Sequence, residues 1–135
     1  MTADKADRNK TIDTPLSKGQ AFLDRCITVT QRQADLDTVM DKTINGDMFG
    51  VCPLLPPESV DLIIADPPYN LTKTFSGTTF TKKKEIDYEE YTRQWLRAVK
   101  PLLKEDGSIY VCCDWETSLI VGRAVSYTHL RAHET

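Results

Sequence analysis

The sequence predicts an α/β fold, part of a doubly wound parallel sheet, from three observations. Two short runs, 62–65 and 109–113, consist almost entirely of apolar residues, as strands buried on both faces do. Between them, apolar residues recur at helical spacing over 88–99, until Pro101 ends the pattern. Strand, helix and strand in this order predict two adjacent parallel strands joined by a right-handed crossover.

The first part of the chain carries weaker signals. Residues 1–20 are polar without an apolar period, so we expect a disordered or loosely attached lead. Residues 43–47 are typical of a short strand that ends in a turn. Asp47 then stands where a side chain can cap a short helix over 48–52.

The second half contains one long connection and one more strand and helix. Residues 71–84 are polar and irregular, which predicts a functional loop. Asp106 and Gly107 predict a turn into the run 109–113. Asp114 follows that run and precedes a helical pattern over 116–124, where we expect it to cap the helix.

Length and composition limit the class of protein. The 135 residues suffice for one domain, and 40% hydrophobic with 27% charged residues is typical of a globular protein. The formal net charge of −3 does not favour nucleic-acid binding by the protein as a whole, so such binding would depend on local basic loops. No apolar run reaches membrane-spanning length, so we expect a cytoplasmic protein. The four cysteines lack C-x-x-C spacing, which predicts reduced, mostly buried thiols and no metal site.

The most informative motif is Asp66-Pro67-Pro68-Tyr69, directly after the run 60–65. Proline fixes φ and has no N–H, so the chain must leave the sheet in a stiff turn. Open α/β sheets bind their ligands at the carboxyl ends of strands. This turn offers a carboxylate, free carbonyls and an aromatic ring, which suit an amino group on a planar base.

The motif resembles the catalytic tetrapeptide of amino-methyltransferases. Together with 44–47, 55–56 and 59–63, it resembles DNA adenine-N6 methyltransferases, in the subgroup whose catalytic motif precedes the cofactor glycine motif. The resemblance covers about residues 43–124. It implies a partial Rossmann-like, doubly wound sheet, with 21–124 as the N-terminal catalytic part of the domain. It also implies double-stranded DNA as partner and a homodimer at full length.

The resemblance implies a catalytic role for the whole turn. The N6 amine of adenine is a poor nucleophile because its lone pair is delocalised into the ring. Asp66 would accept a hydrogen bond from one N–H and the Pro67 carbonyl from the other, with Pro68 completing the turn. Tyr69 would stack on the base once it has flipped out of the duplex.

The implied cofactor is S-adenosylmethionine, with Asp47 and Asn70 as candidate contacts. Each has a simpler alternative: Asp47 as a helix cap and Asn70 as a residue that orients the turn. The expected Phe-x-Gly-x-Gly cofactor loop is absent from the sequence. In the resembling subgroup it lies downstream, so we expect a truncated gene product.

The basic run Lys82-Lys83-Lys84 comes after the turn of the resembling motif, and this position favours contacts with DNA phosphates. A solvated basic loop is the alternative. Phe75 and Phe80 either cover the flipped base or anchor the loop, and the sequence does not separate these roles.

Other functions remain open at this point. Cytosine-N4 methylation needs the same geometry, although that subgroup more often has Ser in place of Asp66. RNA or protein-glutamine methylation more often has Asn there and a glycine loop upstream. A non-catalytic nucleic-acid-binding subunit of a restriction-modification system would use the same stacking ring and lysines.

Residues 125–135 resemble the translation of a transposase-adapter sequence used in DNA library preparation. They also interrupt the helical pattern begun at 117–124. We therefore expect native sequence to end near Ala124. On this reading His129 and His133 carry no functional weight, although their spacing would suit a helical metal pair.

Overall fold

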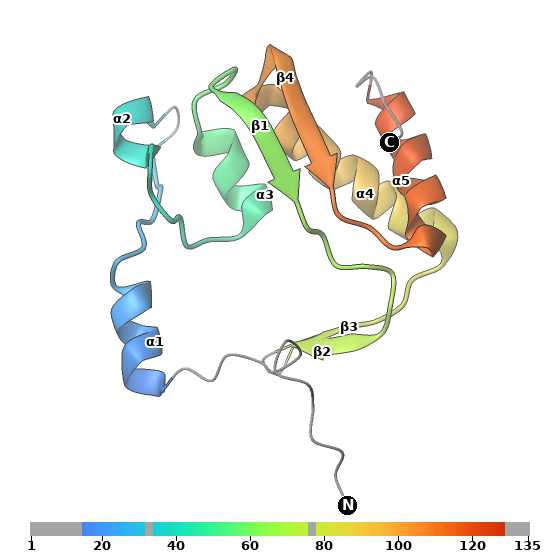
Figure 1. Ribbon diagram of the computed structural model, residues 1–135, viewed down its shortest axis with the longest axis horizontal. Helices are drawn as coiled ribbons and strands as arrows, with labels where there is room; N and C mark the ends of the chain where they lie inside the picture. Colours follow the sequence, from blue (N-terminus) through green and yellow to red (C-terminus); the bar gives the residue numbers. More distant parts are fainter. Residues whose placement is uncertain (1–14, 32–33, 76–77, 129–135) are drawn as a thin grey trace, which may run out of the picture.

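The computed structural model describes residues 15–31, 34–75 and 78–128; for 73–75 and 78 it describes the backbone alone. The chain forms helices and strands in the order α1 (Leu16–Leu23), α2 (Leu36–Val39), α3 (Met48–Val51), β1 (Val60–Ala65), β2 (Lys73–Phe75), β3 (Thr78–Phe80), α4 (Glu85–Val99), β4 (Leu103–Val111) and α5 (Trp115–Tyr127). Two 3₁₀ turns, η2 (Cys52–Leu54) and η3 (Lys100–Leu102), follow α3 and α4. Figure 1 shows β1 and β4 side by side, with α4 and α5 next to them.

The central sheet confirms the predicted strand pairing. β1 and β4 are parallel, with Ile63 opposite Ile109 and Ala65 opposite Val111. The N–H of Cys112 donates to the Ala65 carbonyl at 2.8 Å, which extends the pairing just past the end of β4. Helix α4 connects the two strands, as the apolar pattern predicted.

The doubly wound arrangement is not seen among the described residues. There the main sheet has two strands, β1 and β4. Ile63 and Ile109 pack against the helical core, whereas Leu62, Ile64 and Tyr110 are 48%, 71% and 64% exposed on the opposite face. The described fold is therefore a small parallel sheet with helices on one face.

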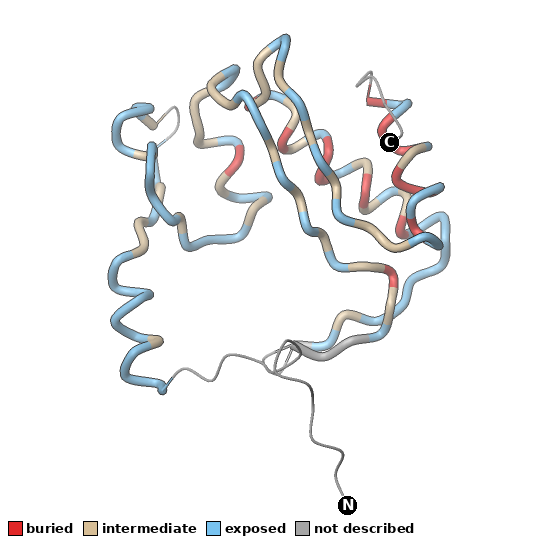
Figure 2. The backbone as a smooth tube through the Cα atoms, viewed as in Figure 1, coloured by how far each residue is buried: buried red, intermediate tan, exposed pale blue. Residues whose placement is uncertain are grey.

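The core lies between α4, α5 and the inner face of the sheet. Figure 2 shows that buried residues concentrate in these two helices. Leu96 of α4 and Ala124 of α5 have no exposed surface, and Trp95 is 3% exposed. The buried residues of α4 follow helical spacing, which explains why the sequence pattern predicted this helix: Tyr88, Thr92, Trp95, Leu96 and Val99.

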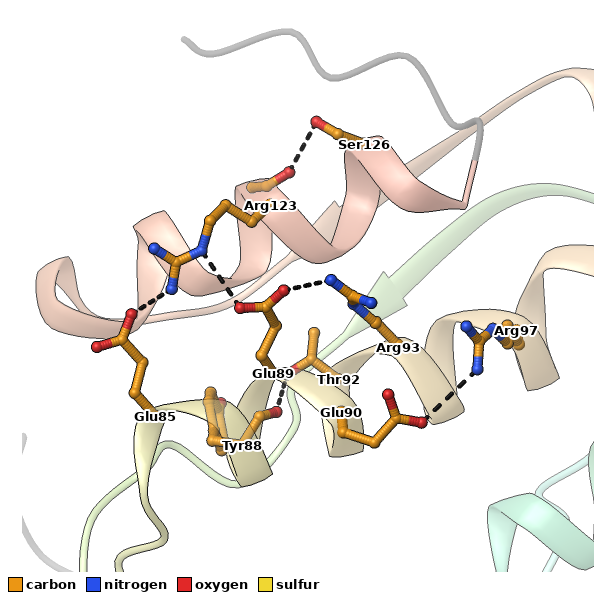
Figure 3. A network of polar contacts seen from close by, with 10 residues as sticks. Glu85, Tyr88, Glu89, Glu90, Thr92, Arg93, Arg97, Arg123 and Ser126 are labelled. Atoms are coloured by element: carbon orange, nitrogen blue, oxygen red, sulfur yellow. Dashed lines mark hydrogen bonds and ion pairs between the residues drawn. The ribbon is translucent and has the colours of Figure 1, made fainter.

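Charged side chains join α4 to α5 along the rim of this core (Figure 3). Arg123 of α5 pairs with Glu85 and places its Nε 3.3 Å from Glu89 Oε2. Glu89 also accepts from Arg93 at 2.5 Å, and its side chain is only 16% exposed. Because Glu89 receives two guanidinium groups, this network fixes the lateral position of α5 on α4.

Residues 16–20, expected to be disordered or loosely attached, form the first part of α1, and none of the residues of α1 is buried. They are therefore helical, and the loose attachment of the lead stays a prediction. The expected interruption after Ala124 is wrong, because α5 continues to Tyr127 and buries Val125. The adapter origin of 125–135 stays a prediction, and His129 and His133 lie outside the described residues.

The expected turn at Asp106 and Gly107 is also wrong. Both residues lie inside β4, at a point where the register with β1 shifts. A Cβ on Gly107 would stand 2.8 Å from the Leu103 side chain and 3.1 Å from the Asp61 carbonyl, so glycine permits the close approach. The loop 71–84 likewise contains structure, since β2 and β3 pair as an antiparallel hairpin.

Candidate active site

The Asp66–Tyr69 turn lies at the carboxyl end of β1, and the segment 112–114 leaves β4 at the same edge. Asp66 is exposed and Tyr69 is half-buried. The negative charge of Asp66 is the main cause that raises the pKa of the Tyr69 hydroxyl, followed by burial and by smaller contributions from Cys112, a hydrogen bond to Asp66, and Cys113. The carboxylate and the ring therefore lie close together, next to the end of β4.

Tyr88 supports this turn from helix α4. Its hydroxyl donates to the Pro68 carbonyl at 3.1 Å, and the residue is 1% exposed. Burial raises the pKa of Tyr88 to about 12, so the hydroxyl remains a donor at neutral pH. Sequence reasoning assigned Tyr88 only to the helix and missed this contact. The available signal was that a buried tyrosine hydroxyl requires a partner.

Asn70 closes the base of the loop that follows the turn. Its side-chain amide donates to the Lys83 carbonyl at 3.0 Å and accepts from the Lys83 N–H at 2.8 Å. The residue is 7% exposed. Both ends of the amide are thus used by the backbone, which favours the turn-orienting role over a cofactor contact; the latter stays a prediction.

The basic run is exposed, but two of its three ammonium groups have partners. Lys82 Nζ lies 3.8 Å from Glu116 Oε2. Lys83 Nζ lies 5.8 Å from the centroids of two aromatic rings. Lys84 occupies the position before α4, where it is exposed. A phosphate contact by these residues stays a prediction, since an exposed pair such as Lys82 with Glu116 exchanges readily with another anion.

The two rings under Lys83 belong to Phe80 and Tyr91, whose centroids are 6.1 Å apart. Phe49 of α3 meets Tyr91 from another side at 6.4 Å. Phe80 therefore anchors the hairpin on α4, which supports the anchoring role over the covering one. The side chain of Phe75 lies outside the described residues.

Asp47 caps α3, as its position in the sequence predicted. Its Oδ2 accepts from the Gly50 N–H at 3.1 Å. The side chain is exposed, and its contact with a cofactor stays a prediction. Burial is the main cause that raises the pKa of Tyr91, and the negative charge of Asp47 adds to it.

Asp114 is the N-cap of α5. Its Oδ1 accepts from the N–H of Thr117 at 2.8 Å and from the Thr117 hydroxyl at 2.7 Å. These hydrogen bonds lower the pKa of the Asp114 carboxyl. The expected capping role is confirmed.

The cysteines are free thiols, but the expectation that most are buried is wrong, because only Cys52 is buried and Cys112 is exposed. Within 15–31, 34–75 and 78–128, no three His, Cys, Asp or Glu residues are grouped so that they could hold a metal ion. No helix of that same portion has the length and apolar character needed to cross a membrane.

Comparison with known proteins yields one family match that includes this turn and relatives that align with about half of the chain. The profile of a family described as DNA methylase matches residues 60–127. The "DNA adenine methyltransferase YhdJ" of Escherichia coli K12 is 37% identical over 68 residues, which cover 50% of this chain and 23% of the relative. The "Type II methyltransferase M.MjaVI" of Methanocaldococcus jannaschii is 44% identical over 69 residues, which cover 49% of this chain and 32% of the relative. The alignment thus spans less than a third of either relative.

Proposed function

We propose that this chain, which belongs to the DNA methylase family, forms the catalytic part of an S-adenosylmethionine-dependent methyltransferase acting on the N6 amine of adenine in DNA. One observation carries the proposal. An Asp-Pro-Pro-Tyr turn stands at the carboxyl end of β1, beside the end of β4, and is supported by Tyr88. The name of the Escherichia coli relative, a DNA adenine methyltransferase, supports adenine as the base.

The turn suits an exocyclic amine because it offers acceptors without donors. Asp66 is exposed, so a carboxylate oxygen can receive one N–H of the amine. Pro67 and Pro68 have no N–H, and among the described residues none donates to the Pro67 carbonyl. That carbonyl can receive the second N–H. Two acceptors at fixed positions draw the nitrogen lone pair out of conjugation and aim it for attack.

When bound, S-adenosylmethionine supplies a methyl group on a sulfonium sulfur, which departs as a neutral thioether. Asp47 would hold the cofactor through its free carboxylate oxygen. The amine nitrogen gains a bond and a positive charge in the transfer, and Asp66 is the base placed to take the surplus proton. No covalent intermediate with the protein is needed.

Tyr69 would bind the flipped base by stacking its ring on the face of the base. Stacking leaves the polar edge of the base free for the hydrogen bonds to the turn. The exposed lysines of the basic run would contact the phosphates of double-stranded DNA. We further propose a cytoplasmic protein that forms a homodimer at full length. The roles of Tyr69 and the lysines are supported by their exposed or half-buried surfaces and by the family to which the chain belongs.

The full-length enzyme provides the test. Purified protein is incubated with labelled S-adenosylmethionine and duplex DNA, and the digested nucleosides are separated by mass spectrometry. Label in N6-methyladenine is the expected result. Label in N4-methylcytosine, or none in DNA, would contradict the proposal. A duplex whose adenines are replaced by purine, which lacks the amino group, is the control and should gain no label.

A further inference from the structure

Tyr88 connects the first part of α4 to the catalytic turn. Its hydroxyl donates to the Pro68 carbonyl across a sequence separation of 20 residues. The ring is almost completely buried, and the Tyr91 ring stands 6.1 Å away. The Thr92 hydroxyl donates to the Tyr88 carbonyl at 2.8 Å, a bond within α4 that does not reach the turn (Figure 3).

The turn requires support from outside because it cannot provide its own. Two consecutive prolines remove two backbone donors, so no hydrogen bond from them can hold the turn. Among the described residues, the donors to its carbonyls are the Tyr88 hydroxyl, at Pro68, and the Leu71 N–H, at Tyr69, 2.6 Å away. The Tyr88 bond is thus the contact that joins the turn to the helical layer.

We propose that Tyr88 is a positioning residue for methyl transfer, which fixes the Pro68 carbonyl and thereby leaves the Pro67 carbonyl directed at the amine. This inference rests on the proposed function of the turn. A peptide plane that can rotate at Pro68 would misplace both the Pro67 acceptor and the Tyr69 ring. Small displacements of that kind lower the rate of reaction more than they weaken binding.

The donor is permanent over the pH range in which the enzyme would work. Burial is the main cause that raises the pKa of Tyr88 to about 12, so the phenol keeps its proton. The titratable groups that face it and add to this effect are Tyr91, Asp114, Cys113 and Tyr69. The hydrogen bond is therefore a fixed structural element rather than a switch.

The test compares two variants of the full-length enzyme, Tyr88→Phe and Thr92→Val. Each removes one buried hydroxyl from the same helix, but only the first removes a bond to the turn. For Tyr88→Phe we expect the single-turnover rate, at saturating DNA and cofactor, to fall about tenfold, the order expected for one lost hydrogen bond. The dissociation constants for DNA and cofactor should stay within about twofold, and Thr92→Val should keep its rate.

Two results would overturn the proposal. An unchanged rate in Tyr88→Phe would show that the bond does not position the turn. An equal loss in both variants, in proportion to their loss of thermal stability, would show a structural role only. If the wild-type enzyme methylates no DNA, the proposed function fails instead, so the two failures are distinguishable.

Should Tyr88→Phe fail to fold, fluorinated tyrosines at position 88 keep the ring and the hydroxyl while lowering its pKa. We then expect the single-turnover rate to fall as the pH rises through the lowered pKa of each analogue. The wild-type rate is measured over the same pH range. It shows how much of the pH dependence comes from the neighbouring groups Tyr69, Tyr91, Cys113 and Asp114 rather than from position 88. A rate that is the same across the series at every pH would overturn the proposal.

Discussion

Replacing Asn70 with alanine should release the loop that follows the Asp66–Tyr69 turn. The Asn70 amide makes two hydrogen bonds to the backbone of Lys83, 13 positions away, and so joins both ends of the segment that carries the β2–β3 hairpin. Alanine removes both bonds and leaves the Lys83 N–H and carbonyl to water. The hairpin would then lose its attachment beside the turn.

The size of the effect follows from the two bonds. A neutral hydrogen bond contributes about 0.5–1.5 kcal/mol net, so two contribute about 1–3 kcal/mol. The Lys83 side chain is exposed, and water reaches its backbone groups once the loop opens. We therefore expect the lower part of that range, about 1–2 kcal/mol, in the free energy of local opening. This corresponds to roughly 5–30-fold faster exchange of the Lys83 amide.

Amide hydrogen exchange measured by NMR or mass spectrometry on the full-length enzyme provides the assay. The matched control is Thr72→Val, which removes a single exposed acceptor, since the Lys82 N–H donates to the Thr72 hydroxyl at 3.1 Å. This variant should change exchange at Lys83 by less than about threefold. Unchanged exchange at Lys83 in Asn70→Ala would refute the reasoning. It would favour the alternative, in which Asn70 contacts the cofactor directly.

Three further predictions concern the helices and the ring. Asp114→Ala should lower the free energy of unfolding by about 1 kcal/mol at neutral pH. Because the Thr117 bonds lower the pKa of Asp114, its stabilisation should disappear as the pH falls below about 4, which pH-dependent denaturation would show. Leu96→Ala should cost about 2–5 kcal/mol in chemical denaturation, since Leu96 is fully buried. Tyr69→Phe should keep most methylation, whereas Tyr69→Ala should lose roughly 10–100-fold in rate, as loss of base stacking predicts.

Local signals in the sequence predicted much of the central fold. The apolar runs of β1 and β4, and the buried spacing of α4, identified the parallel pair and its crossover helix. Asp47 and Asp114 are both helix caps because a short acidic side chain before a helix satisfies free N–H groups within three residues. Such features depend on neighbours in the chain, so a sequence displays them directly.

Features that depend on the path of the chain were not predictable in the same way. The bonds from Tyr88 to Pro68 and from Asn70 to Lys83 join residues 20 and 13 positions apart. The β2–β3 hairpin consists largely of polar residues, so no apolar alternation marked it. At Asp106 and Gly107 the residue types favoured a turn, but both residues lie inside β4, at the irregularity where its register with β1 shifts.

Methylation by Asp66→Ala tests the central claim most directly. Single-turnover transfer to an adenine-containing duplex by the full-length enzyme should fall by more than about a hundredfold, with cofactor binding retained, because the role proposed for Asp66 is to bind the amine. The matched control is Asp61→Ala, which removes an exposed carboxylate of the same strand that pairs with Lys104 at 2.7 Å. That variant should keep the wild-type rate. A rate near wild type in Asp66→Ala would contradict the account.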